Sequence, residues 1–269
     1  MLHSIARMHG LAIQAKDGEV GVVEDFYFDD DTWAIRYLVV DTSRWLGGRS
    51  VLISPIALGS KAWASDRLTV ALTRKQIENS PPVDTHRPVS RQEEATFSAY
   101  YGYPYYWGGG GLWGAGSYPI YPALTKTDDT EMRGTSAESL KNPEDVHLRS
   151  VKEVKGYAID AADGEIGHVH DLIVEDQSWA IRYLEVATRN WWPGKKVLVS
   201  PQWVENVSWT ERKVGIGLFR KAIQTGPEYR ESAPIYRDYE QLVYDHYGLP
   251  GYWLTRADAG AAVRRSKAS

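Results

Sequence analysis

The chain contains one segment twice, at a constant offset of 146 residues. The stretch DGEVGVVEDFYFDDDTWAIRYL begins at Asp17, and DGEIGHVHDLIVEDQSWAIRYL begins at Asp163. The offset holds without a gap through the Ser-Pro pairs at Ser54 and Ser200. Two copies of this length predict two similar domains, each able to bury its own core, rather than a solenoid of many repeats.

The repeat sets the expected domain boundaries. Repeat 1 spans residues 2–107 and repeat 2 spans residues 148–253. Residues 108–147 are rich in Gly, Ser and Pro, a composition that predicts a linker. Trp113 and Tyr118 are exceptions in this stretch and are candidates for docking it on a barrel or on a partner. Residues 254–269 are predicted to be a short flexible tail.

Each copy has the pattern of a small β domain. Asp17-Gly18 supplies the positive φ of a tight hairpin turn, and the β-branched and aromatic run over residues 33–40 predicts a strand. Similar short runs follow at 49–54 and 67–72. We therefore predict a mainly β fold with two small antiparallel barrels of about six strands each.

A short α-helix is predicted after each barrel. Ser90 and Glu93 have the spacing of a capping box at a helix start, and Gly102 can end the helix in a left-handed conformation. Repeat 2 has Gly248 at the matching place. Each helix is followed by a segment that ends in Trp107 or Trp253, and we expect that tryptophan to fold back and become buried.

Composition excludes several classes of function. The chain has no cysteine, so thiolate nucleophiles and cysteine-based zinc sites are impossible. A net charge of −4 argues against a general polyanion-binding surface, and we do not expect nucleic-acid binding. No apolar run has the length of a membrane span or of a secretory leader, which predicts a soluble, cytoplasmic protein.

Two mid-strand arginines need partners if they are buried. Arg36 and Arg182 each lie between apolar residues on one strand face, and a buried guanidinium requires a compensating group. Asp25 and Asp171 lie on the preceding predicted strands. We predict structural ion pairs between Asp25 and Arg36 and between Asp171 and Arg182, with a ligand-facing arginine as the alternative.

No catalytic residue, metal site or cofactor is predicted. His168 and His170 lie on one strand face, where Glu165 or Glu185 could complete a metal site, but a solvated strand face is the preferred interpretation. The glycines at 108–111 lack the strand and the Lys-Ser/Thr of a phosphate loop.

Loop aromatics are the predicted partner contacts. Trp45-Leu46 and Trp191-Trp192 occupy matching loops between neighbouring strands. Aromatic residues are enriched at protein interfaces, although capping a barrel end would explain these equally well.

The repeated motif resembles the PRC-barrel. The residues that carry the resemblance are Asp17-Gly18-Glu19, Gly21, the run Trp33 to Leu38, and Val51 to Pro55, with their counterparts in repeat 2. The resemblance implies a six-stranded antiparallel barrel, as in the cytoplasmic part of the photosynthetic reaction-centre H subunit and the C-terminal half of a ribosome-maturation factor. It implies no shared catalytic residues.

The sequence thus predicts a non-enzymatic module that binds a protein partner or self-associates. Packing of the two barrels about a pseudo-twofold axis is one form of this hypothesis. An accessory protein of a photosynthetic or electron-transfer complex and an RNA-processing or ribosome-assembly factor are the alternatives.

Overall fold

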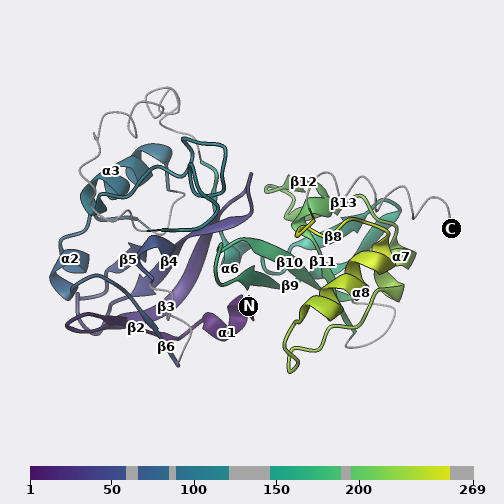
Figure 1. Ribbon diagram of the computed structural model, residues 1–269, viewed down its shortest axis with the longest axis horizontal. Coiled ribbons are helices and arrows are strands. Elements are labelled where there is room, and N and C mark those ends of the chain that lie inside the picture. Colours follow the sequence, from purple (N-terminus) through teal and green to yellow (C-terminus); the bar gives the residue numbers. More distant parts are fainter. Residues whose placement is uncertain (59–65, 85–88, 121–145, 189–194, 255–269) are drawn as a thin grey trace. The chain divides into compact units, whose positions relative to one another are not determined.

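The computed structural model describes residues 1–58, 66–84, 89–120, 146–188 and 195–254 (Figure 1). These residues form two sheets, one of six strands and one of seven, together with short helices. The predicted mainly β fold is confirmed, with a helix after the strands of each repeat.

The six-stranded sheet has the order β5-β4-β3-β2-β6, and β7 pairs with β3 off this path. Its strands are β2 (Ala12–Ala15), β3 (Gly18–Asp29), β4 (Ala34–Asp41), β5 (Ser50–Ile53), β6 (Arg67–Thr69) and β7 (Leu148–Ser150). The pairing of β2 with β6 is parallel, whereas β3 pairs antiparallel with β2, β4 and β7. The last strand of repeat 1 thus returns beside β2.

The seven-stranded sheet has the order β11-β10-β9-β8-β13-β12, and β1 pairs with β9 off this path. Its strands are β1 (Leu2–Ser4), β8 (Ala158–Ala161), β9 (Gly164–Glu175), β10 (Ile181–Thr188), β11 (Lys196–Val199), β12 (Val204–Ser208) and β13 (Lys213–Ile216). The pairing of β8 with β13 is again parallel. Each sheet therefore departs at one place from the antiparallel pairing that we predicted.

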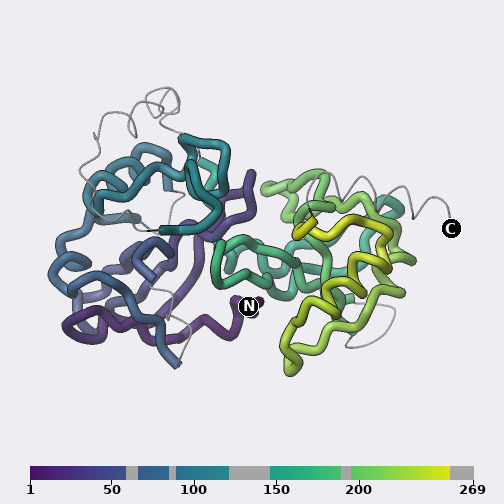
Figure 2. Tube along the Cα trace, viewed as in Figure 1, coloured from purple at the N-terminus to yellow at the C-terminus, as the bar shows by residue number. Residues whose placement is uncertain are grey.

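The two repeats exchange their first strands. Strand β1 begins repeat 1 but pairs with β9, and β7 begins repeat 2 but pairs with β3, with Ser150 opposite Tyr27 and Leu148 opposite Asp29. The path of the chain can be followed in Figure 2. Each sheet thus consists of strands of one repeat together with the first strand of the other repeat.

The compact units reflect this exchange. The repeat-1 unit contains Ile5–Glu153 and Val174–Ile181, and the repeat-2 unit contains Met1–Ser4, Val154–Ile173 and Arg182–Ser269. The units therefore combine segments differently from the sequence repeats at 2–107 and 148–253.

A second exchanged segment joins the repeat-1 unit at the β3–β4 turn. The amide of Ile35 donates to the carbonyl of Trp179 at 2.8 Å, and the amide of Ile181 donates to the carbonyl of Trp33 at 2.7 Å. The two bonds are equivalent under the 146-residue offset. Trp33 and Trp179 have φ values of 53° and 58°, which are uncommon for bulky residues and are maintained by these contacts.

The predicted terminal helices are present with their predicted ends. Helix α3 (Arg91–Tyr101) begins with the Ser90–Glu93 capping box and ends at Gly102, whose φ is 69°. Helix α8 (Arg237–Tyr247) ends at Gly248, whose φ is 64°. The other helices among the described residues are α1 (Ile5–Met8), α2 (Arg74–Glu78), α6 (Val151–Val154) and α7 (Arg220–Thr225), with single 3₁₀ turns η1 (Pro55–Ala57) and η2 (Pro201–Trp203).

Helix α3 packs on the sheet through aromatic contacts. Phe97 is buried and meets Tyr37 of β4 edge to face, with ring centroids 5.2 Å apart. The segment after the helix folds back as predicted, but the buried ring is that of Tyr106, whereas Trp107 and Trp253 are only half-buried. The expected burial of the tryptophans was wrong. Tyr106 is buried in place of Trp107 because its hydroxyl donates a hydrogen bond to the buried carboxylate of Glu94.

The start of the predicted linker is docked on the repeat-1 unit. Trp113 is buried and its indole Nε1 donates to the carbonyl of Ser178 at 2.7 Å. Tyr118 and Ile120, by contrast, are exposed. Residues 121–145 of the linker and 255–269 of the tail lie outside the described residues. In the part of the chain that is described, no helix is both long and apolar enough to cross a membrane.

Close backbone approach requires a glycine at position 21. A Cβ atom there would lie 2.0 Å from the carbonyl oxygen of Asp41. We expect Gly21→Ala to lower the free energy of unfolding by about 1–3 kcal/mol or more, because the strands must move apart. Urea denaturation measures the loss. Gly110→Ala is the matched control, since no atom lies within 4 Å of its added Cβ; equal effects of the two changes would contradict the prediction.

Candidate functional site

The predicted partner of Arg36 is wrong. Arg36 on β4 is 1% exposed, and its guanidinium donates to the carbonyl of Leu112 at 2.7 Å and to the hydroxyl of Thr32 at 2.9 Å. It lies 3.7 Å from the ring centroid of Tyr106 and 4.7 Å from that of Trp113. Burial lowers the pKa of Arg36, and the neighbouring Tyr106 opposes that effect.

The β3–β4 register explains why Asp25 does not pair with Arg36. Asp25 lies opposite Val39, and its carboxylate accepts from the hydroxyl of Ser150 at 2.5 Å and from the amide of Lys152 at 3.0 Å. Burial raises the pKa of Asp25, although these hydrogen bonds lower it. The docked linker carbonyl and the aromatic rings thus compensate the arginine, and the aspartate holds the exchanged strand.

The repeat-2 unit has an equivalent serine–aspartate hydrogen bond to its exchanged strand. The hydroxyl of Ser4 donates to Asp171 at 2.5 Å, and Lys155 Nζ lies 3.5 Å from the same carboxylate. Ser4 and Asp171 are the 146-residue equivalents of Ser150 and Asp25, so each aspartate binds the serine of the other repeat. The guanidinium of Arg182 lies 4.1 Å from the ring centroid of Tyr252, and its pairing with Asp171 stays a prediction.

A buried glutamate on each terminal helix was missed by the sequence analysis. Glu94 of α3 accepts from the hydroxyl of Tyr106 at 2.6 Å, and its other oxygen lies 3.0 Å from His147 Nε2 and 3.3 Å from Arg91. Burial and the charge of Glu94 raise the pKa of the Tyr106 hydroxyl well above its usual range. This cluster fastens the helix to the sheet.

Glu240 of α8 plays the same part in repeat 2. It accepts from the hydroxyls of Tyr183 at 2.9 Å and Tyr252 at 2.7 Å, and Arg237 lies 3.0 Å away. The retention of Glu94 and Glu240 at equivalent positions is the signal that could have identified them, since most other positions on these helices differ between the copies.

The strands of repeat 1, the turn at Asp17-Gly18 and the Ser54-Pro55 pair lie in one continuous stretch of the sequence. Residues 3–75 match the PRC-barrel domain. The match ends before α3, so the helix and its buried glutamate lie outside the matched range. A PRC-barrel domain indicates, in general, a protein-interaction or assembly module. No curated protein matches the chain.

Only some of the predicted partner contacts can be placed. Trp45 and Leu46 are half-buried, and both amides donate to the carbonyl of Thr42 in a turn after β4. The guanidinium of Arg74 lies 4.4 Å from a ring centroid of Trp45 and covers one face of it. Trp191 and Trp192 lie outside the described residues. Partner binding by these loops stays a prediction.

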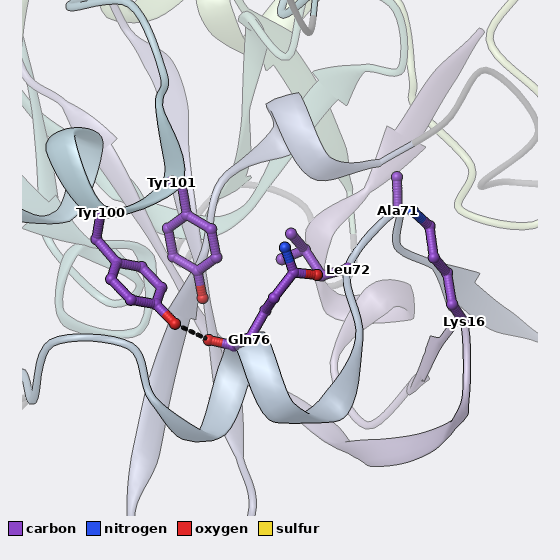
Figure 3. Close-up of a pocket in the computed structure, with 6 residues that line it drawn as sticks. All are labelled: Lys16, Ala71, Leu72, Gln76, Tyr100 and Tyr101. Atoms are coloured by element: carbon purple, nitrogen blue, oxygen red, sulfur yellow. Dashed lines mark hydrogen bonds between the residues drawn. The ribbon is translucent and has the colours of Figure 1, made fainter.

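A cavity of about 490 Å³ lies beside α3 in the PRC-barrel unit of repeat 1. Its lining comprises Lys16, Ala71, Leu72, Gln76, Tyr100 and Tyr101 (Figure 3). The hydroxyl of Tyr100 donates to the carbonyl of Gln76 at 2.8 Å, a bond that joins α3 to α2. With one exposed lysine and no histidine or carboxylate in the lining, this cavity offers shape and hydrogen bonds rather than acid–base chemistry.

The histidine pair is divided by the structure. His170, Glu185 and Glu231 lie together in the repeat-2 unit, whereas His168 is not in this group. The Glu185 side chain is 1% exposed, and Lys196 Nζ lies 2.7 Å from its Oε1. Burial raises the pKa of Glu185 to about 7, although the bond to Lys196 lowers it.

This raised pKa predicts a pH dependence of stability. A carboxyl whose folded pKa lies above its unfolded value of 4.5 stabilises the fold fully below that value, and the stabilisation is lost as the pH rises through about 7. We expect wild type to lose stability between about pH 5 and pH 8 relative to Glu185→Val. Urea midpoints in chelator-containing buffer measure this, with the exposed Glu211→Gln as control. Parallel pH profiles for wild type and Glu185→Val would contradict the prediction.

Proposed function

We propose that the chain is a non-enzymatic module that docks a partner protein on the α7–α8 side of repeat 2. The PRC-barrel match supports the general class of interaction module. The choice of surface rests on positions where repeat 2 has a different residue from repeat 1. Two copies of one fold need the same structural residues, so a residue that differs between them is not required by the fold.

The departures that carry the proposal are at the two helix starts. In repeat 1, Thr73 caps α2 and Ser90 caps α3, each with a complete capping box. The equivalent residues of repeat 2 are Phe219 and Tyr236, and neither side chain caps its helix. Losing such a cap costs about 0.5–2 kcal/mol. Folding therefore gives no reason for the aromatic residues.

These side chains are instead presented to solvent. Phe219 is 65% exposed, Tyr236 is 64% exposed, and Leu242 of α8 is 55% exposed. Repeat 1 has Thr96 where repeat 2 has Leu242. Exposed aromatic and aliphatic side chains that stability does not require are typical of protein-binding surfaces.

Phe219 and Tyr236 come directly before α7 and α8, and Leu242 lies on α8, so the packing of these two helices positions all three residues. The ring Nε2 of His246 lies 2.9 Å from the carbonyl of Ala222, and the hydroxyl of Tyr239 donates to the carbonyl of Pro227 at 3.3 Å. Figure 1 shows the two helices side by side. The two helices are thus a firm support for these apolar side chains.

The charges around α7 and α8 favour a protein partner over an anionic membrane. Asp238 and Asp245 are exposed on α8, while Lys221 and Arg230 are exposed nearby in sequence. A surface of mixed sign suits a polar interface rim and lacks the cluster of basic residues that anionic lipids attract.

The test replaces the three exposed side chains with those of repeat 1. We expect the Phe219→Thr, Tyr236→Ser, Leu242→Thr variant to lose its partner in affinity capture, with binding weakened by about tenfold or more. We expect the same variant to unfold at a higher temperature, because it regains two capping residues. Sedimentation velocity on both proteins shows whether the partner is a second copy of the chain.

Two results would contradict this placement of the site. One is unchanged capture by the triple variant. The other is loss of the partner in Trp45→Ala alone at unchanged thermal stability, which would place the contact on the loop after β4. The gain in stability keeps the test interpretable, because lost binding cannot then be assigned to unfolding.

A further inference from the structure

Repeat 2 contains a compact group of metal-ligand side chains that come from different elements. His170 lies on β9, Glu185 lies on β10, and Glu231 lies after α7. One ligand atom from each lies within 4.8 Å of the other two. His170 Nε2 is 3.5 Å from Glu231 Oε1 and 3.8 Å from Glu185 Oε1.

Backbone pairing fixes these positions. Leu198 of β11 lies opposite Glu185, so Lys196, two residues earlier, faces the same side of the sheet on the diagonal. The amide of Tyr229 donates to the carbonyl of Lys196 at 2.8 Å. This bond holds the segment that carries Glu231 along the edge of β11.

Repeat 1 shows that the fold does not need this group. At the positions of His170, Glu185 and Lys196 it has Glu24, Val39 and Ser50. Val39 is buried in repeat 1 as Glu185 is in repeat 2. Placing a carboxylate where a valine suffices costs stability, so its presence calls for a role other than packing.

The group already holds a cation. Lys196 Nζ lies 2.7 Å from Glu185 Oε1 and also contacts Glu231 Oε1. The ammonium stands where a metal ion bound by both carboxylates would lie. Both carboxylate oxygens of Glu185 are buried, and neither makes a geometrically complete hydrogen bond among the described residues, although Lys196 Nζ lies close to Oε1. Such an oxygen has lone pairs free to bind a cation.

We propose that His170, Glu185 and Glu231 bind a divalent transition-metal ion of the zinc type, which displaces the ammonium of Lys196. One imidazole nitrogen and two carboxylate oxygens form a three-ligand set of the kind that zinc accepts, with a fourth position open to water.

The exposed groups permit the adjustment that coordination needs. The side chains of His170 and Glu231 are 44% and 50% exposed, so both can rotate inward toward the fixed carboxylate of Glu185. Lys196 is 22% exposed on a flexible stem and can turn its ammonium to solvent. Metal binding therefore needs side-chain rotation and no change in the sheet.

The experiment is a Zn²⁺ titration of the full chain, freed of metal by chelation, followed by calorimetry. We expect one Zn²⁺ per chain, and binding at least about tenfold weaker in Glu185→Val and in His170→Ala. Glu185→Val carries the repeat-1 residue and His170→Ala shortens a side chain that is 44% exposed, so both variants are expected to fold. Lys196→Met is expected to bind at least about tenfold tighter, because the competing ammonium is gone. His246→Gln, which changes an exposed histidine on α8, is the control for adventitious binding.

Three results would overturn the proposal. The first is no saturable binding in wild type or in Lys196→Met. The second is Glu185→Val binding Zn²⁺ as tightly as wild type. The third is Lys196→Met binding no tighter than wild type, since displacement of the ammonium is required. The first two results would leave the group an ion-pair network without a metal function, and the third would show that metal binding does not displace the ammonium of Lys196.

Discussion

The structure depends on the exchange of the first strands between the two repeats. Strands β1 and β7 are short, and a serine–aspartate hydrogen bond adds to the backbone pairing of each, from Ser4 to Asp171 and from Ser150 to Asp25. A carboxylate that accepts a hydroxyl in a buried place makes a stronger bond than a neutral pair does. Because each sheet is completed by the other repeat, neither repeat has all of its strands alone.

Internal repetition also separates structural from functional residues. Glu94 and Glu240 occupy equivalent buried places and bind tyrosine hydroxyls in both copies, so they belong to the shared fold. Phe219 and Glu185, by contrast, replace Thr73 and Val39, which already meet the needs of the fold. The interaction surface and the metal site that we propose both rest on such departures, and both lie in repeat 2.

Much of the fold follows from local sequence, and the features that were not predicted depend on contacts between residues far apart in the chain. The strands, the capping box at Ser90 and the glycine end of α3 obey short-range rules and were predicted. The strand exchange could not be, because residues 2–4 and 148–150 have equivalent apolar and serine positions, so either could complete either sheet. The partner of Arg36 escaped prediction because it is a backbone carbonyl at Leu112, supplied by a segment that composition marks as linker.

Thiol cross-linking tests the strand exchange most directly, since the chain has no native cysteine. Two double-cysteine variants would be treated with a short bifunctional thiol reagent, one at Ser4 and Asp171 and the other at Ser4 and Asp25. The exchange predicts rapid cross-linking within one chain for the first pair. Efficient cross-linking of Ser4 to Asp25, with none to Asp171, would show that each repeat keeps its own first strand and would contradict the account.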